Sequence, residues 1–230
     1  MDSSDYYIFV RTKIQIYATP ESSVANCFIL FKRILNNSYE VFSLILKSAL
    51  GDSLSTLQLP IPDNIPNEVP RLVLQYDGYN INVAKNRCEI IIQKSDIILN
   101  GTLERFLNID FSSLNIQFNR VGVIKTYFKK AQIEELKKLL NSELASQDIT
   151  EISIRINRPD NRHEIPCNNV EKLDMGKAQI TNNGIPTTQD GIIIIKDLNT
   201  NPIRKEDIPI ATIKDLVNEM LADDNFILLS

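Results

Sequence analysis

Two alternating apolar runs meet at the dipeptide Asp77-Gly78, and no other feature of the sequence constrains the fold as strongly. Alternation places every second side chain of a strand on one face, and Asp-Gly is a preferred two-residue turn between antiparallel strands. We therefore predict a hairpin over residues 72–83 with a type I′ turn. Its register is set because a slip of one residue would move the apolar set to the opposite face. The predicted pairs are Tyr76 with Tyr79, Leu74 with Ile81 and Leu72 with Val83 on the apolar side, and Gln75 with Asn80 on the polar side.

Further runs rich in β-branched residues predict more strands. Where apolar residues fall at every second position, a half-buried strand is expected, and a short unbroken apolar run predicts a strand buried on both faces. In the run 114–123 the alternation changes phase at Asn119-Arg120, which predicts a β-bulge or a bend. The other predicted strands are the half-buried 6–17 and 152–156, the doubly buried 192–195, and 88–93 as a third strand beside the hairpin.

Apolar residues at helical spacing predict four helices, at 24–35, 41–50, 131–145 and 213–221. Thr212 and Asp215 come close to a capping-box pattern at the start of the last helix. The C-terminal residues 226–229 are expected to form a last strand or a docked tail. Because hairpins and long helices mix without βαβ repeats, the predicted fold class is α+β, an antiparallel sheet with hairpins packed against several long helices.

A proline-rich segment suggests how the chain is divided. Four prolines lie within residues 60–70, and a segment with so few backbone donors does not continue a helix or a central strand. The length of 230 residues suits a single domain. We therefore predict one α+β domain over 1–230, in which a lobe of residues 1–59 is connected through 60–70 to a main lobe of residues 71–230.

Composition bears on location and partners. The three cysteines, Cys27, Cys88 and Cys167, have neither zinc-ligand spacing nor the even number of a disulfide framework, which favours a reducing cytoplasm. The start of the chain lacks the basic and apolar regions of a signal peptide, and no run of eighteen apolar residues predicts a membrane span. The net charge of −4 makes nucleic acid an unlikely partner.

The residues that usually carry enzyme chemistry are scarce. The only histidine, His163, has polar neighbours and is interpreted as a surface residue rather than a catalytic base. The glycines Gly176, Gly184 and Gly191 are too far apart for a nucleotide-binding motif and are interpreted as turn residues. We therefore predict no catalytic residues, no metal ligands and no cofactor.

One acidic set leaves an enzymatic alternative open. Asp190, Lys196 and Asp197 flank the apolar run 192–195, and carboxylates with a lysine on a strand can serve a metal-dependent nuclease. The spacing differs from the usual acidic-x-Lys pattern, because the residue two positions before Lys196 is Ile194. The favoured interpretation is that the two aspartates bracket a strand at its turns.

Two groups of residues are candidate binding surfaces. The polar face of the predicted hairpin carries Gln75, Asn80 and Asn82, as a recognition surface or as an ordinary solvated face. The second group is the basic stretch Lys125, Lys129, Lys130, Lys137 and Lys138. Glutamates interleave with these lysines, so the favoured interpretation is a solvated helix face. The alternative is a nucleic-acid contact.

Three stretches together resemble a sporadically distributed, uncharacterised bacterial protein family of similar length. They are the run 70–78 leading into the hairpin, the strand residues 119–122, and the helix 213–221 followed by Phe226. The resemblance implies a cytoplasmic α+β protein of the accessory type found in conflicts between bacteria and phage. It implies no catalytic residues.

The leading hypothesis is therefore a non-enzymatic protein that binds another protein or itself, as a component or inhibitor of a bacterial anti-phage defence system. A well-patterned core without a catalytic set motivates this hypothesis. The first alternative is a metal-dependent nuclease or hydrolase that uses carboxylates such as Asp190 and Asp197. The second alternative is a nucleic-acid-binding adaptor that uses the basic stretch 125–138.

Overall fold

A single antiparallel sheet dominates the protein. The computed structural model describes residues 8–18, 38–59, 64–84, 86–92, 101, 104–109, 117–140, 142–182, 185–201, 203 and 206–226. In these residues nine strands form one sheet in the order β2-β3-β4-β5-β1-β6-β9-β8-β7, and neighbouring strands are antiparallel throughout. The strands are β1 (Ile8–Ala18), β2 (Ser55–Gln58), β3 (Leu72–Tyr76), β4 (Tyr79–Val83), β5 (Arg87–Ile92), β6 (Phe118–Lys130), β7 (Ser153–Arg162), β8 (Ile165–Asn182) and β9 (Ile185–Thr200).

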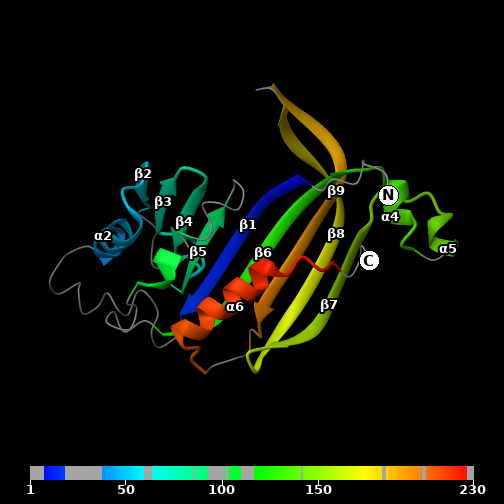
Figure 1. Cartoon of the computed structure of the whole chain (residues 1–230). Helices are drawn as coiled ribbons and strands as arrows, with labels where there is room; N and C mark the ends of the chain where they lie inside the picture. The colour runs from blue at the N-terminus through cyan, green and yellow to red at the C-terminus, as the bar shows by residue number, and fades with distance from the viewer. Residues whose placement is uncertain are drawn as a thin grey trace.

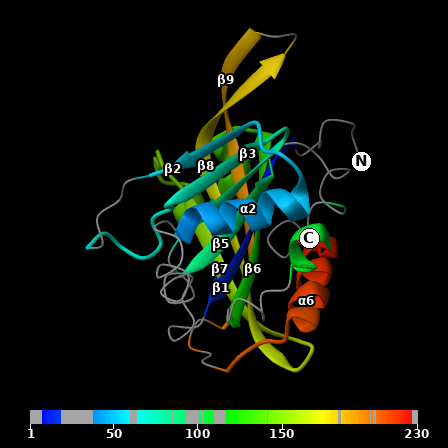
Figure 2. The ribbon, with the colours of Figure 1, turned by 90° about the vertical axis from the view of Figure 1, so that its left-hand side faces the viewer.

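The predicted α+β fold with several long helices is wrong. The two longest helices of the described residues, α2 (Ser38–Leu50) and α6 (Ile210–Ala222), have 13 residues each. The helices α4 (Ile133–Lys137) and α5 (Ser142–Ala145) have five and four, and a further short helical segment includes residues 104–107. Figure 1 shows α6 lying across β1, β6 and β9, and α2 beside β2 to β5. Figure 2 shows α2 from the side, in front of these strands. The sheet, rather than layered helices, therefore organises the core.

The predicted helix 131–145 is replaced by α4 and α5. Leu136 is buried, and Leu140 packs against the same small core, so the apolar stripe is used. The backbone N–H groups of Leu139 and Leu140 donate to carbonyls only three residues back. Such bonds tighten the chain into 3₁₀-type turns, which seldom continue for long. Leu144, the last residue of the predicted stripe, is exposed.

The predicted hairpin is confirmed in its register. β3 and β4 pair Leu72 with Val83, Leu74 with Ile81, Gln75 with Asn80 and Tyr76 with Tyr79. The two tyrosine rings stack with centroids 4.6 Å apart. The turn type differs from the prediction. Gly78 has φ +86°, but Asp77 is not among the described residues with positive φ, which a type I′ turn would require at both positions.

The bulge predicted at Asn119-Arg120 is also confirmed. In the pairing of β1 with β6, Tyr17 lies opposite Arg120 and Ala18 opposite Phe118, so Asn119 is left over. The extra residue changes which positions of the strand face the core. As a result Phe118 before the bulge and Val121 after it are buried in the same core. Ile14 and Ile16 of β1 are buried in the same core, as predicted.

Helix α6 covers this core from one face of the sheet. Its residues Ile213, Leu216, Val217 and Met220 are buried, as the helical spacing predicts. The predicted capping box does not form, because the helix begins earlier. Its N-cap is Pro209, which has no side-chain cap. The helix α2 confirms the prediction for 41–50, with Leu46 and Leu50 in the core.

The strands β7, β8 and β9 are longer than the sequence suggests. The strand predicted for 152–156 is the first half of β7, and the run 192–195 is the middle of β9. Within this run Ile192 and Ile194 are buried, whereas Ile193 and Ile195 are only half-buried. Beyond the pair Gly176–Gly191, strands β8 and β9 pair only with each other in the described residues. Figure 1 shows this part of β8 and β9 projecting from the sheet as a two-stranded ribbon. Gly176 and Gly191 are thus strand residues rather than turn residues.

The segment before the prolines joins the same sheet as the segment after them. β1 pairs with β5 and β6, and β2 pairs with β3 across the proline-rich stretch. The helix predicted at 24–35 and the residues 227–229 lie outside the described residues. The separate lobe 1–59 stays a prediction.

Candidate functional site

The predicted recognition surface on the hairpin lies on one face of the sheet. Gln75, Asn80 and Asn82 project from the face opposite the buried Leu74 and Ile81. Gln75 is exposed, and the two asparagines are half-buried. Ser55 of β2 donates its hydroxyl to Gln75 Oε1 at 2.6 Å. The structure therefore brings the three predicted residues together, next to the terminal strand of the sheet.

That terminal strand, β2, is a candidate site that the sequence did not predict. Its four residues are all exposed, and β3 is its only neighbour in the described sheet. Four large apolar side chains in the described residues are more than half exposed, and two of them lie on β2 or just before it: Leu54 at 77% and Leu57 at 54%. The sequence has leucines at positions 54 and 57, but β2 has only four residues and three of them are polar.

The backbone of β2 has groups directed away from the sheet. Leu59 donates its N–H to the carbonyl of Arg71 at 2.8 Å. Because antiparallel bonding alternates along a strand, Leu57 also faces β3, opposite Val73. The N–H and C=O of Thr56 then face the outer edge. Such an edge is a template for pairing with another strand.

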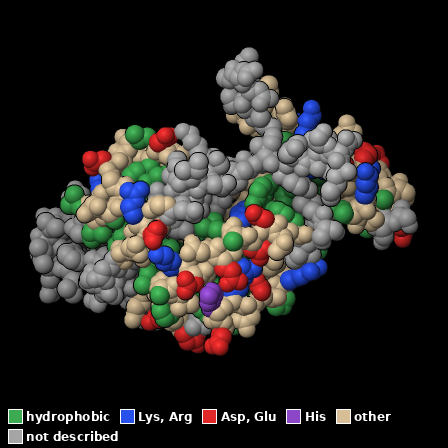
Figure 3. Space-filling view, in the orientation of Figure 1, with side chains coloured by type: hydrophobic (Ala, Val, Ile, Leu, Met, Phe, Trp, Pro, Cys, Tyr) green, Lys and Arg blue, Asp and Glu red, His purple; other side chains and the backbone are tan. Residues whose placement is uncertain are grey.

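The predicted basic stretch does not form one surface. Lys125, Lys129 and Lys130 lie on β6, a strand, and not on a helix. Lys125 is buried, Lys129 forms an ion pair with Glu135 of α4 at 3.2 Å, and Lys130 is exposed. Successive residues of a strand point to opposite faces, so Lys129 and Lys130 diverge. In Figure 3 the visible lysines and arginines are scattered among acidic side chains rather than gathered in one basic patch.

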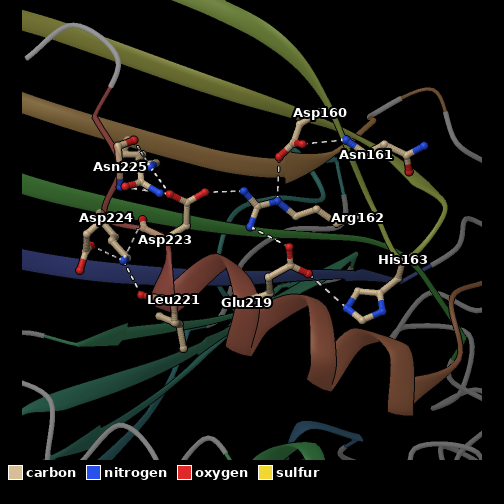
Figure 4. A network of polar contacts seen from close by, with 11 residues as sticks. Asp160, Asn161, Arg162, His163, Glu219, Leu221, Asp223, Asp224 and Asn225 are labelled. Carbon is tan, nitrogen blue, oxygen red and sulfur yellow. Dashed lines mark hydrogen bonds and ion pairs between the residues drawn. The ribbon is translucent and has the colours of Figure 1, made fainter. Parts of the chain in front are cut away.

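Lys125 instead donates to Asp224, in a polar network between the sheet and the end of α6. Figure 4 shows this network with Arg162, Asp223 and Asp224 labelled. Lys125 of β6 lies directly opposite Lys196 of β9, so both side chains are on the face that α6 covers. Only 6% of the Lys125 side chain and 0% of the Lys196 side chain are exposed. Like charges directly opposite each other destabilise a sheet unless they are neutralised.

The end of α6 and the segment after it neutralise Lys125. Lys125 Nζ donates to the carbonyl oxygen of Leu221, to that of Asp223 at 3.3 Å and to Asp224 Oδ1 at 2.6 Å. The Leu221 carbonyl is in the last turn of α6, where carbonyls lack helical partners and a cation is favourable. The hydroxyl of Tyr127 donates to the same Asp224 oxygen at 3.1 Å.

Asp223 bridges Lys196 and Arg162. Lys196 Nζ donates to Asp223 Oδ1 at 2.6 Å and to the carbonyl of Asn225 at 2.5 Å. Arg162, at the end of β7, donates from Nη2 to Asp223 Oδ2 and from Nε to Asp160 Oδ2 at 2.7 Å. Burial alone would raise the pKa of Asp223, but the hydrogen bonds from Lys196 and Arg162 outweigh it and hold the pKa below its ordinary value of 3.8.

His163 lies at the rim of this network, in the turn between β7 and β8. His163 and Glu164 have φ values of +50° and +61°, so this turn has the two left-handed residues of a type I′ turn. The imidazole Nε2 is 3.2 Å from Glu219 Oε2, and 42% of the side chain is exposed. The predicted surface position of His163 is confirmed.

The lowered pKa of Asp223 predicts an acid-sensitive contribution to stability. A carboxyl group with a depressed pKa stabilises the folded chain above its ordinary pKa, and this contribution disappears as the pH falls. The difference in unfolding free energy between wild type and Asp223→Asn should therefore shrink as the pH is lowered below about 4. Urea denaturation at a series of pH values measures it.

Asp197 provides a control with the opposite sign. Burial raises its pKa, and the hydrogen bond from Asn199 and the charges of Arg120 and Arg155 offset only part of this effect. Asp197→Asn should therefore gain stability relative to wild type as the pH rises above about 4. A gap between wild type and Asp223→Asn that stays constant with pH would contradict the role assigned to Asp223.

The aspartates considered for a metal-dependent enzyme do not converge. Asp190 and Asp197 are both on the continuous strand β9, seven residues apart. At about 3.3 Å per residue they are ~23 Å apart, and an odd separation places them on opposite faces. Asp190 is exposed and 3.5 Å from Lys177. In the part of the chain that the structure describes, no group of three or more His, Cys, Asp or Glu residues is arranged to hold a metal ion.

The polar network is not predictable from the sequence because its members are far apart in the chain. The local sequence pattern around each of Lys125, Lys196 and Asp223 indicates only a strand or the end of a helix.

The chain matches no model of a known protein family and no curated protein. None of the helices in the described ranges is long and apolar enough to cross a membrane.

Proposed function

We propose that this chain is a cytoplasmic, non-enzymatic protein that binds another polypeptide by adding a strand of the partner to the outer edge of β2. The observation that carries the proposal is that β2 pairs on one side only within the described sheet, together with the exposed Leu57 on it and Leu54 just before it. Soluble proteins normally blunt such edges with charges, prolines or covering segments. None of the four residues of β2 is charged or a proline.

The edge defines the chemistry of the partner. Backbone groups of Thr56 would hydrogen-bond an extended segment, which supplies affinity without dependence on sequence. Leu54 and Leu57 would contact apolar side chains of that segment, which supply selectivity. Leu57 lies on the same face as Gln75, since it pairs with Val73 two residues away, so the polar surface predicted from the hairpin flanks this contact.

The biological setting in bacterial anti-phage defence rests on the resemblance described above. The cytoplasmic location agrees with Cys88 and Cys167, which are buried free thiols. Burial raises the pKa of the Cys167 thiol to about 11, which keeps it protonated and unreactive at neutral pH.

A selection from a random peptide library against the immobilised full chain tests this proposal. We expect the enriched peptides to be rich in apolar and β-branched residues, which favour strands and can contact Leu57. Thr56→Pro removes the outward N–H without breaking a bond to β3, and should weaken binding by about tenfold, the effect of roughly one hydrogen bond.

Two further variants sharpen this test. Leu57→Lys should abolish binding, because a lysine on an edge strand opposes pairing. Leu144→Lys is the matched control, since Leu144 is 43% exposed on α5, outside β2, and should leave binding unchanged. Peptides that bind Thr56→Pro as well as wild type, or a selection that enriches none, would refute strand addition at β2.

A further inference from the structure

The segment 223–226 contacts the sheet as a bound peptide would. In the described residues it belongs to no helix or strand, so its removal breaks no ladder bond. Its polar contacts with Lys125, Lys196 and Arg162 use only carboxylate and main-chain carbonyl oxygens. These are groups that any acidic peptide can present.

The two sides of this contact differ in secondary structure. The cations lie on three strands, β6, β9 and β7, and their side chains are between 0% and 8% exposed. On the other side residues 223–226 lie outside regular elements, and the side chains of Asp223 and Asp224 are 15% and 67% exposed. The sheet therefore provides a formed, cationic site, and the segment provides the ligand.

An aromatic contact adds selectivity to the charges. The ring of Phe226 packs edge-on against Tyr127 with centroids 5.3 Å apart, and Lys196 Nζ is 5.4 Å from the centre of the same ring. Phe226 also packs against the small core of Leu136 and Leu173. The site thus fits two successive acidic residues followed, after one further residue, by an aromatic residue.

An empty site would be unfavourable. Without the segment, Lys125 and Lys196 would be opposite each other with Arg162 nearby, and like charges directly opposite are destabilising. Another anionic group should therefore enter the site when the segment leaves.

We infer that Lys125, Lys196 and Arg162 form a binding site for the sequence Asp-Asp-x-aromatic, which residues 223–226 fill in cis and for which an acidic segment of a partner polypeptide competes. This site is separate from β2, and binding to it does not depend on strand addition there. The partner is defined by the chemistry of the segment that it displaces. Because the contacts are charged, binding should weaken with rising salt.

A peptide in trans tests this inference on the full chain. The probe is the fluorescently labelled peptide Leu-Ala-Asp-Asp-Asn-Phe, which copies residues 221–226. The variant Asp223→Asn/Asp224→Asn weakens the cis segment, and it should bind the probe at least about tenfold more tightly than wild type, a difference of ~1.4 kcal/mol. Adding Lys196→Met should abolish this binding. Fluorescence anisotropy gives both affinities.

Two controls establish that the probe binds at the cationic site and through its carboxylates. A probe with Asn-Asn in place of Asp-Asp should not bind, and Thr56→Pro in the double variant should leave probe binding unchanged. A folded double variant that does not bind the probe, or that binds both probes equally, would overturn the inference.

Should the double variant fail to fold, hydrogen exchange on the wild-type protein tests whether residues 223–226 leave the sheet. The amide of Asn225, which donates to Asp223 Oδ1, should exchange faster than amides of β6, and equal rates would overturn the inference.

Discussion

Gly191→Ala should lower the free energy of unfolding by about 3 kcal/mol, which is at the upper end for overpacking of a well-packed core. A Cβ atom at this position would be 2.3 Å from the backbone carbonyl oxygen of Lys129 and 2.5 Å from the ring of Phe128. Phe128 is only 1% exposed, so its ring has little room to move. The backbone of β6 or β9 would have to shift at the last pair between these two strands, Lys130–Gly191.

Gly101→Ala is the matched control for this prediction. No atom lies within 4 Å of a Cβ built on Gly101, and its φ is outside the left-handed region. Its effect on stability should therefore be within about 0.5 kcal/mol of zero. Urea denaturation followed by circular dichroism measures both variants. Equal stabilities of Gly191→Ala and wild type would show that β6 and β9 do not pack as closely as described.

Asp223→Ala should lower the free energy of unfolding by about 3 kcal/mol, because a buried ion pair that loses one partner leaves the other uncompensated. Asp223 accepts hydrogen bonds from both Lys196 and Arg162, and 15% of its side chain is exposed. The lysine can reach water once residues 223–226 leave the sheet. The loss is therefore limited to the free energy with which that segment docks.

A double-mutant cycle with Lys196→Met isolates the pair. Methionine has a similar length and no charge, so it removes the cation that Asp223→Ala leaves without its carboxylate. The double variant should be more stable than the sum of the two single effects predicts, by about 1–2 kcal/mol. Asp190→Ala, on the same strand β9 but 73% exposed, serves as a control with little effect. Additive effects of Asp223→Ala and Lys196→Met would contradict a direct bond.

Features that depend on neighbours in sequence were predictable. The alternation around Asp77-Gly78 predicted the pairing of β3 with β4 residue by residue, and the phase change at Asn119 predicted the bulge in β6. Both follow because a strand with one buried face must keep its apolar residues on that face. The turn type was not predictable to the same degree, because Gly78 alone can supply the positive φ.

Features that depend on distant partners were not predictable. The strand β8 carries polar residues such as Asn168 and Lys172, and it is a strand because it pairs with β7 on one side and β9 on the other. In the helix predicted at 131–145, the apolar residues Leu136 and Leu140 do pack against a core. That core is small, and the short helix α4 is enough to cover it. Tertiary contacts override local propensity in both cases.

The sequence by itself determined that this chain forms antiparallel strands with one apolar face and an amphipathic helix, α6, near its C-terminal end, because alternation and helical spacing are local properties. Only the tertiary structure decided which chemistry these elements expose. The register of β6 against β9 places Lys125 opposite Lys196, and the end of α6 brings Asp223 to both of them across 98 and 27 positions of the chain. No local pattern encodes such a meeting, because it arises from the order in which the strands pair and from burial on a shared face.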